Sequence, residues 1–272
     1  MTTAVLTASD TPGAHAGWFA QTAQITKRWI TNTLRVVWGA AFSLVQPVVW
    51  ILLFGQVFSS LGTLPQFGGA GYIDYLVPGV LMMTVLYSGA WAGSGYIDDM
   101  KSGVMDQLLT APISRSAIIT GQLVQQLLIC LAQSIVVLGI GWLGGARYPG
   151  GIGGTGIALV SALVLGTTFC SVSTALALTT RNQVALIGIS QIVVLPVTFL
   201  STTMMPSALM PGWVQNVSRF NPMTWAVDIG RHALAGTTDW GAAGWQAAGL
   251  VALAALAFFW SVRAIGGYQR SL

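Results

Sequence analysis

The stretch YPGGIGGTGIALVSALVLGTTFCSVSTALALTT, residues 148–180, contains no Lys, Arg, Asp or Glu. An α-helix rises about 1.5 Å per residue, so roughly 20 apolar residues are enough to cross a hydrocarbon core about 30 Å thick. Five more stretches without a charged residue reach that length: residues 36–73, 75–97, 116–146, 182–218 and 240–262. The pattern predicts an all-α integral membrane protein with six transmembrane helices.

Composition supports the same fold class. Charged residues make up 7% of the 272 residues, mean hydropathy is +0.72 and 11 residues are Trp, whereas about 25% of an ordinary soluble domain is charged. Cys130 and Cys170 lie in apolar stretches, away from any CxxC or Cys/His spacing, so they are expected to pack in the interior. No metal site and no catalytic residue is predicted.

The spans are expected near residues 37–58, 75–95, 117–141, 156–179, 184–203 and 243–264. They form a transmembrane domain, residues 37–264. A cytoplasmic N-terminus, residues 1–36, precedes it, and a cytoplasmic tail, residues 265–272, follows it. Because the first ~25 residues lack a basic segment followed by an apolar run, no cleaved signal peptide is predicted.

The segment from Gly17 to Val36 has amphipathic spacing. Trp18, Ile25 and Trp29 fall on one helical face together with Val36, and Gln and basic residues lie beside or opposite it. Such a helix is expected to lie in the membrane interface with its Trp residues at headgroup depth. The alternative is a slightly extended first span.

Basic residues indicate the orientation of the chain. With a cytoplasmic N-terminus and six crossings, eight of the 11 basic residues are cytoplasmic and three lie outside: Arg147, Arg219 and Arg231. This distribution agrees with the positive-inside rule and puts both termini in the cytoplasm. The Ala, Gly and Trp content is typical of a GC-rich bacterium, so the expected location is the bacterial inner (plasma) membrane.

Residues 204–240 are expected to form short re-entrant helices on the outer side, before the last span. The interval from Asn182 to Ser218 is too long for one span, so its second half, with Pro206 and Pro211, is expected to break and turn. Irregular backbone at membrane depth is tolerated only where protein or a watery cavity satisfies its polar groups. Asn221 as N-cap and Pro222 at the first helical position are expected to begin one of these helices.

The connection between spans 2 and 3, residues 97–115, is the charge-rich segment inside the chain. It is expected to be cytoplasmic and to form a short helix that Pro112 ends. An apolar strip at helical spacing, flanked by charges and exposed to the cytoplasm, is typical of a helix that docks into a groove on a partner. The strip consists of Val104, Met105, Leu108 and Leu109. An ordinary solvated loop is the alternative.

Two motifs resemble segments of a known family. The pattern Gly103-x-x-Asp106-x-Leu108-x-Thr110-x-Pro112-Ile113-x-Arg115 resembles the coupling segment of ABC transporter type 2 permeases, in the drug-resistance and polysaccharide export branch. A second set precedes the last span and is similar to the daunorubicin-resistance-like permeases: Pro211-Gly212-Trp213-Val214, Asn221-Pro222-Met223-Thr224, Val227-Asp228 and Arg231. Family members often carry Glu where this chain has Asp98, Asp99 and Asp106, and a basic-acidic pair where Lys101-Ser102 stands.

The resemblance implies a permease subunit that is driven by separate ATPases. The chain lacks the G-x-x-x-x-G-K-[ST] phosphate-binding loop, so ATP and Mg are expected on a partner subunit, and no cofactor on this chain. The implied partners are two ATP-binding cassette ATPase subunits, a second permease copy or a sister permease, and membrane lipid, but no nucleic acid. The residues implied in ATPase coupling are Asp98, Asp99, Lys101, Gly103, Met105, Asp106, Leu108, Leu109, Pro112 and Arg115.

In the family, spans 1, 2 and 5 line a substrate path between two membrane domains. The implied lining residues of this chain are Gln46, Met82, Met83, Tyr87, Trp91, Thr198, Phe199, Met204 and Met205. Flexible Met and aromatic surface suits a large apolar or amphipathic ligand, and helix packing or lipid contact is the alternative for each residue. The implied function is export of a hydrophobic drug, antibiotic or lipid-like molecule, with polysaccharide or glycolipid export as the alternative.

Two rival function classes lack the residues that they need. A proton-coupled secondary carrier usually has ionisable groups at mid-membrane, and the expected spans carry none there. An intramembrane enzyme needs a nucleophile with a base or a set of metal ligands, but the chain has no Glu, no H-E-x-x-H motif and only two histidines, His15 and His232.

Overall fold

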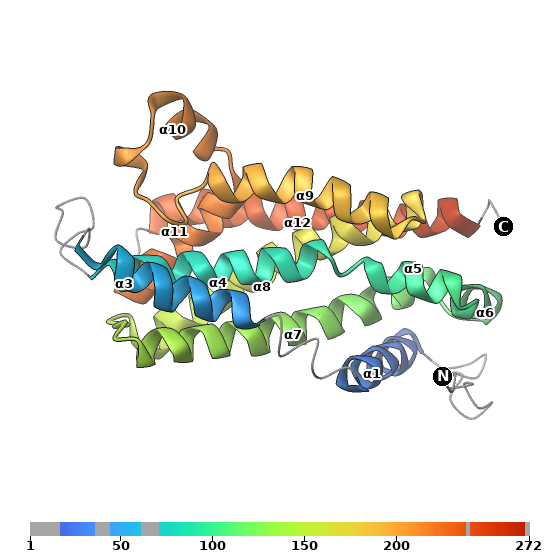
Figure 1. The fold of residues 1–272 in the computed structure, drawn as a ribbon. Coiled ribbons are helices and arrows are strands. Elements are labelled where there is room, and N and C mark those ends of the chain that lie inside the picture. Colours follow the sequence, from blue (N-terminus) through green and yellow to red (C-terminus); the bar gives the residue numbers. More distant parts are fainter. Residues whose placement is uncertain (1–16, 36–43, 61–70, 238–239, 270–272) are drawn as a thin grey trace.

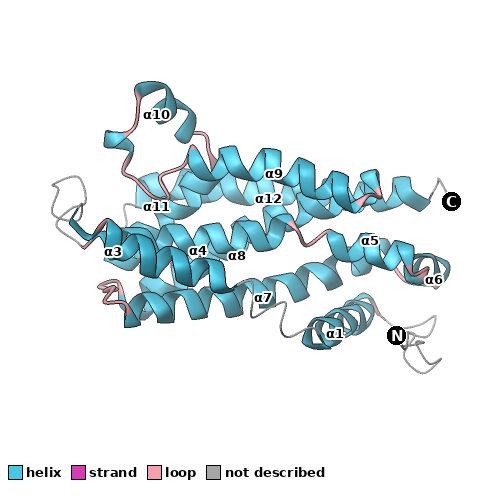
Figure 2. Cartoon of the chain, viewed as in Figure 1, coloured by secondary structure: helices cyan, strands magenta, loops and turns pink. Residues whose placement is uncertain are grey.

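The computed structural model describes residues 17–35, 44–60, 71–237 and 240–269 (Figure 1). In these residues the chain forms helices joined by short loops, without a strand (Figure 2). The all-α fold class predicted from the sequence is therefore confirmed for the described part. Some predicted boundaries lie outside it, in residues 1–16, 36–43, 61–70, 238–239 and 270–272.

Four helical segments are long and apolar enough to cross a membrane, which makes the chain a multi-pass membrane protein. They are α4 (Tyr72–Ala90) continued by α5 (Ser94–Lys101), α7 (Arg115–Leu143), α8 (Gly151–Thr180), and Ala243–Gln269 within α12 (Trp240–Gln269).

Two shorter apolar helices stand at the positions of the expected spans 1 and 5. They are Leu44–Val57, which includes the π-helical η1 (Trp50–Phe54) and α3 (Gly55–Val57), and α9 (Gln183–Phe199). Each expected span thus coincides with an apolar helix, and four of these helices have spanning length. The count of six crossings stays a prediction.

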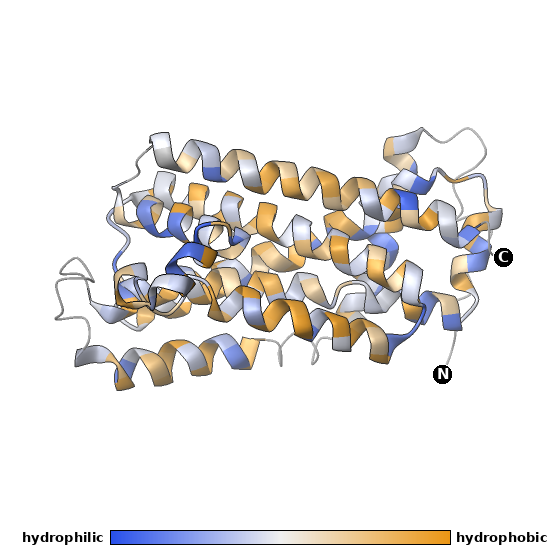
Figure 3. Cartoon of the chain, turned by 90° about the horizontal axis from the view of Figure 1, so that it is seen from above, coloured by the Kyte–Doolittle hydropathy of each residue, from blue (hydrophilic) through white to orange (hydrophobic). Residues whose placement is uncertain are grey.

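The central helix of the bundle is α8, which lies against α4, α7, α12 and α11 (Pro222–Ala235). Hydrophobic residues cover most of the length of the long helices, and hydrophilic residues gather toward their ends (Figure 3). Figure 1 shows α1 (Trp18–Arg35), α5 and α6 (Val104–Thr110) at one end, which we name the coupling end. It shows α10 (Gly212–Ser218) and α11 toward the other end, which we name the opposite end.

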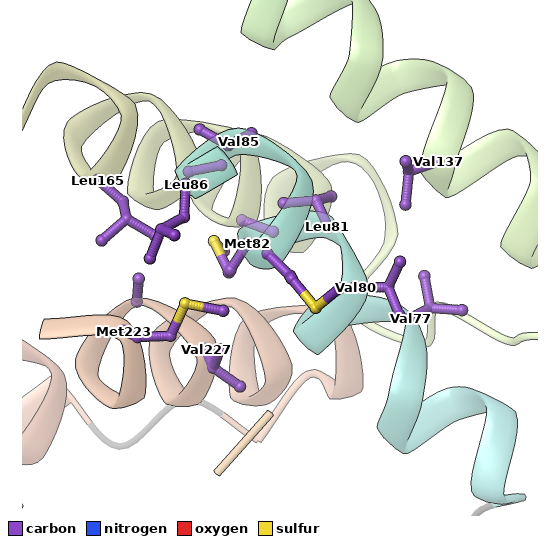
Figure 4. Close-up of a cluster of buried hydrophobic side chains, with 14 of the residues drawn as sticks. Val77, Val80, Leu81, Met82, Val85, Leu86, Val137, Leu165, Met223 and Val227 are labelled. Carbon is purple, nitrogen blue, oxygen red and sulfur yellow. The ribbon is translucent and has the colours of Figure 1, made fainter. Parts of the chain in front are cut away.

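A hydrophobic core surrounds α4. Leu81, Met82 and Leu86 are fully buried among side chains of α7, α8 and α11 (Figure 4). Glycine lets α8 and α11 approach closely, since a Cβ at Gly154 would lie 2.0 Å from Ala233 O. Close contact between backbones through small residues is how helices pack within a membrane.

The segment between α9 and α12 forms short helices, as predicted: η4 (Ser207–Leu209), α10 and α11. Asn221 caps α11 by accepting a hydrogen bond from Met223 N (2.9 Å), and Pro222 is the first helical residue. The Asn221 Nδ2 group donates to Val197 O (2.7 Å) and Leu200 O (3.0 Å). The predicted cap is confirmed, and it also ties α11 to the end of α9.

The helix α1 is amphipathic and packs on the bundle at the coupling end. Ile25 and Trp29 are buried, and Thr26 Oγ1 donates to Gly121 O of α7 (3.0 Å). A Cβ at Gly121 would lie 2.5 Å from Ile25 Cγ2, so this close contact requires glycine. The predicted amphipathic helix is therefore confirmed, and its apolar face meets α7 of the same chain.

Candidate functional site

The predicted coupling segment folds as two short helices with a turn between them. Gly103 has a φ of +74°, a left-handed conformation that favours glycine, and it leads the chain from α5 into α6. The helix α6 ends at Thr110, shortly before Pro112, as predicted. Ser114 then begins α7, where its hydroxyl accepts a hydrogen bond from Ala117 N (3.3 Å).

The apolar face of α6 points into the core of its own chain. Met105 is fully buried and Leu108 is 5% exposed, in a cluster with side chains of α1, α5, α8 and α12. Val104 and Leu109 are half-buried beside them. The expectation that this strip is exposed to a partner is therefore wrong. Its apolar surface is removed from water within the permease domain itself, which stabilises the position of α6.

The outer face of the coupling segment is polar and charged. Its exposed members, among the residues implied in coupling, are Asp98, Lys101, Asp106, Pro112 and Arg115. Gly103 is half-buried at the turn. A partner approaching from outside the bundle would meet this face first.

Asp99, also implied in coupling, is turned toward α1. It forms an ion pair with Arg28 through Nη2 and Oδ2 and through Nη1 and Oδ1, the second contact at 3.3 Å. The two side chains are 14% and 12% exposed. Arg28 also lies 4.8 Å from the centre of the Trp29 ring, and the Trp29 and Tyr96 ring centres lie 5.7 Å apart in an edge-to-face arrangement. Asp99 therefore holds α1 to α5 and is engaged within the chain.

A second contact joins α1 to the far end of the coupling segment. Gln21 Oε1 accepts hydrogen bonds from Ser114 N (3.0 Å) and Ser114 Oγ (3.2 Å). Trp18 Nε1 donates to Ser116 Oγ (3.0 Å). Because α1 is fixed near both ends of the coupling segment, a displacement of the coupling segment is expected to move α1, and a displacement of α1 to move the coupling segment.

The ends of α8, α9 and α12 also reach the coupling segment. Lys101 Nζ donates to Gln183 Oε1 (3.3 Å), and Tyr268 Oη donates to Asp106 Oδ1 (3.4 Å). Arg181, at the end of α8, places its guanidinium 4.6 Å from the Tyr268 ring centre. The segment is thus connected to three further apolar helices of the bundle.

A cavity of about 430 Å³ lies beside the coupling end, between α1, Leu44–Val57, α4 and α7. Ligand sites commonly measure roughly 300–1,000 Å³. Of the nine residues implied in the substrate path, the structure brings four together on its wall: Gln46, Met83, Tyr87 and Trp91.

The other five implied path residues lie elsewhere. Met82 is buried in the core of Figure 4, on the side of α4 that faces α11. Consecutive residues of a helix point about 100° apart, so Met82 and Met83 face different neighbours. Thr198 is buried, Met204 is half-buried, and Phe199 and Met205 are exposed. These five residues do not form one site with the cavity.

Glutamines of α7 line the cavity, and the sequence reading missed them. Gln125, Gln126 and Gln133 follow Gln122 by three, four and eleven residues, so the four side chains share one face of the helix. Polar side chains at helical spacing within a charge-free stretch were the signal that could have found them.

Arg231 joins three elements at the opposite end. Its Nη2 donates to Tyr75 O (3.3 Å) and Thr202 O (2.9 Å), and its guanidinium lies 3.5 Å from the Tyr75 ring centre. Its Nη1 lies 3.5 Å from Asp228 Oδ1, and Thr202 Oγ1 donates to the same carboxylate oxygen (2.8 Å). This network fixes α4 and α11 to the segment that follows α9.

The connection between α7 and α8 is fixed to α4 at the same end. Asp74 Oδ1 accepts a hydrogen bond from Arg147 N (2.7 Å), and Tyr148 Oη donates to Leu138 O (2.8 Å). Burial, and then the nearby Asp74, raises the pKa of Tyr148 to about 12, so its hydroxyl stays protonated and remains a donor.

One known family pattern extends over most of the chain. The pattern described as ABC-2 type transporter matches residues 20–235. The chain belongs to the ABC-2 type transporter family. In this ABC-2 permease the matched residues include most of α1, the coupling segment, the cavity and the Arg231 network, and they end where α11 ends.

Several named permeases are similar to this ABC-2 permease. A daunorubicin resistance ABC transporter permease protein of Streptomyces coeruleorubidus is 29% identical over 240 residues, 82% of this chain and 83% of the relative. A putative transport permease of Porphyra purpurea is 28% identical over 198 residues, 72% and 67% of the two chains. A probable doxorubicin resistance ABC transporter permease protein of Mycobacterium tuberculosis is 21% identical over 207 residues, 76% and 72%. All three relatives are named as permeases, and two of them are named for drug resistance.

Proposed function

We propose that the chain is the membrane-spanning permease subunit of an ATP-binding cassette exporter, and that with a second permease it forms the path for a hydrophobic drug, antibiotic or lipid-like substrate. The observation that carries this proposal is the coupling end, where a charged outer face on α5 and α6 is backed by an apolar face anchored in the membrane domain. The drug-resistance names of two relatives support the substrate class.

In this proposal, ATP and Mg bind to separate ATPase subunits, because the chain has no phosphate-binding loop. Two ATPase subunits dock on two permease copies, or on this chain and a sister permease, in a bacterial inner membrane. The exposed residues of the coupling segment meet the ATPase. Met105, Leu108 and Leu109 act through the position of α6 and do not touch the ATPase.

The contacts of α1 provide a route from the ATPases to the cavity. ATP-driven closure pushes on the outer face of α5 and α6, and α1 moves with them because the Arg28–Asp99 pair and Gln21 join the elements. Since α1 contributes Trp29 and Thr33 to the cavity wall, the cavity changes with the nucleotide state. Such coupling requires the nucleotide states to bind the two conformations with different affinity.

Co-purification tests the proposal. The tagged chain is extracted from its native membrane, and its partners are identified and assayed for vanadate-sensitive ATP hydrolysis. We expect a subunit with a phosphate-binding loop, and ATP-dependent drug uptake by inverted vesicles. A chain that purifies alone and moves substrate on a proton gradient after reconstitution would instead be a secondary carrier. ATP-dependent movement of a labelled glycolipid, without drug transport, would favour the polysaccharide or glycolipid alternative.

A further inference from the structure

The cavity beside the coupling end has a mainly apolar wall that carries several polar but uncharged side chains. Five glutamines line it, Gln46 from the helix Leu44–Val57 and four from α7. Trp29, Tyr87 and Trp91 supply aromatic surface. Among the described residues of its wall there is no Lys, Arg, Asp, Glu or His. The cavity therefore offers hydrogen bonds and ring contacts without a counter-charge.

The hydrogen-bonding groups of the cavity are held in place by its wall. Gln125 Nε2 donates to Thr33 Oγ1 (2.9 Å), and Gln126 Nε2 donates to Ser88 Oγ (2.8 Å). A Gln amide has two N–H donors and a carbonyl acceptor, and within the described part of the chain these two carbonyl oxygens accept no hydrogen bond. The buried Trp29 Nε1 has no partner there either. The two amide carbonyls are thus acceptors for a ligand that enters the cavity.

A charged ligand would find no compensation in this cavity. Arg28 stands next to Trp29 in the sequence, but its charge is paired with Asp99. A cation on the Trp29 ring would meet the Arg28 guanidinium, which already lies 4.8 Å from the ring centre. Burial of an unpaired charge is unfavourable, whereas a hydroxyl, carbonyl or amide group can exchange its bonds to water for bonds to the glutamines.

We propose that this cavity binds an uncharged amphiphile, a molecule with a flat ring system and with hydroxyl, carbonyl or amide groups along one edge, and that it rejects charged forms. The rings lie against the aromatic side chains, and the polar edge faces the glutamines of α7. This inference deepens the proposed function. It rests on the proposed function only in treating the bound molecule as a transported substrate. It narrows the substrate class from hydrophobic drugs in general to uncharged ones.

The position of the cavity connects the ligand to the coupling end. Trp29 packs on Gly95 of α5, where a Cβ would lie 2.6 Å from its ring. The neighbouring Arg28 binds Asp99 of the same helix. A ligand that packs against Trp29 therefore lies at the contact between α1 and α5, which the Arg28–Asp99 ion pair holds together. Ligand binding and coupling to the ATPase thus influence each other.

A matched pair of probes tests whether the cavity prefers an uncharged ligand to a charged one. Dansylcadaverine carries a primary ammonium group, and its N-acetyl derivative keeps the ring and the tail without the charge. The full-length chain in phosphatidylcholine nanodiscs is titrated with each probe, and energy transfer from Trp to the dansyl group reports binding, with nanodiscs lacking the chain as background. We expect the uncharged probe to bind at least about tenfold more tightly, because a buried ammonium has no counter-charge in the cavity.

Glutamine variants locate the site. The double substitution Gln125→Leu with Gln126→Leu is expected to weaken binding of the uncharged probe by about tenfold, because two hydrogen-bonding side chains are lost. Gln191→Leu makes the same change in α9, outside the cavity, and should leave the affinity unchanged. Gln125→Glu places a carboxylate beside Thr33 and should reverse the preference toward the cation. Failed folding cannot produce a reversal, so this variant keeps the test decisive.

Four results would overturn the inference: equal affinity for the two probes, tighter binding of the cation to the unsubstituted chain, unchanged affinity in the double variant, or no saturable binding. None of them bears on co-purification with an ATPase, so the binding site can fail while the proposed function stands. Selective binding of the uncharged probe without an ATPase partner would keep the binding site and remove its role in export.

Discussion

Arg28 of α1 and Asp99 of α5 form an ion pair across 71 residues of sequence, and this pair closes the contact between the amphipathic helix and the start of the coupling segment. Both side chains are largely buried. Removal of one partner leaves the other charge without compensation, which costs more than the loss of an exposed pair. The pair therefore fixes α1 to the coupling end, so that α1 takes part in coupling.

Arg28→Gln is expected to loosen α1 and to uncouple ATP hydrolysis from transport. We expect a loss of about 2 kcal/mol in stability, less than the ~3–5 kcal/mol of fully buried pairs because both side chains keep some exposure. Thermal unfolding in detergent and drug-stimulated ATP hydrolysis measure the two effects. Lys27→Gln, on the exposed side of α1, is the control and should change neither. A double-mutant cycle with Asp99→Asn that shows no interaction energy would contradict the assignment.

Asp106→Arg is expected to reduce coupling while membrane insertion stays intact, because Asp106 is exposed on α6 and lies outside the spans. Transport per ATP hydrolysed should fall at least about fivefold, the lower range of a coupling energy between two sites. Tyr268→Phe serves as the control, since it removes the hydroxyl that donates from α12 to Asp106 and leaves Asp106 itself in place. An equal loss in Tyr268→Phe would assign the effect to the α12 contact and not to an ATPase.

The sequence predicts the positions of the helices better than the directions of their faces. A charge within a bilayer is costly whichever way it points, so a charge-free stretch such as residues 148–180 marks a helix without reference to its neighbours. The cap at Asn221 and Pro222 is equally local, because an N-cap depends on the residues beside it. Both features could therefore be predicted.

The inward turn of α6 could not be predicted from its own residues. Met105 and Leu108 have the spacing of a docking helix whether the groove belongs to a partner or to the same chain, and only the positions of α8 and α12 decide between them. The cavity could be predicted only in part, because the direction of some of its side chains also depends on where the neighbouring helices lie. Tyr87 and Trp91 suggested a path by their type, whereas the shared face of the α7 glutamines has meaning only once α4 and α1 are placed against it.

Gly154→Ala is expected to destabilise the bundle, whereas Gly153→Ala is not. A Cβ at Gly154 would lie 2.0 Å from Ala233 O, and a Cβ at Gly153 would meet nothing within 4 Å. The first change forces α8 and α11 apart at a cost of about 1–3 kcal/mol, and the second should gain up to about 1 kcal/mol of helix propensity. Thermal midpoints in detergent report the difference. Equal midpoints for the two variants would mean that the two helices do not approach this closely.

Arg231→Lys is expected to lower stability and to release the segment after α9. Lys keeps the charge but lacks the planar guanidinium that donates to Tyr75 O and Thr202 O and lies on the Tyr75 ring. We expect a loss of about 1–3 kcal/mol, read as a lower thermal midpoint. Arg219→Lys makes the same change at an exposed arginine of the opposite end and should have little effect. An unchanged midpoint in Arg231→Lys would show that the network does not stabilise the fold.

Cysteine labelling measures the orientation of the two ends. Cys130 and Cys170 are buried, so a membrane-impermeant maleimide should leave the unsubstituted chain unlabelled in intact cells. Eight of the 11 basic residues belong to the side that we assign to the cytoplasm, so Lys101→Cys should react only in inverted vesicles and Arg147→Cys in intact cells. Both residues are exposed, which makes each the control for the accessibility of the other. Labelling of Lys101→Cys from outside would place the coupling end where no ATP-bearing subunit can reach it, and the proposed export mechanism would fail with the topology.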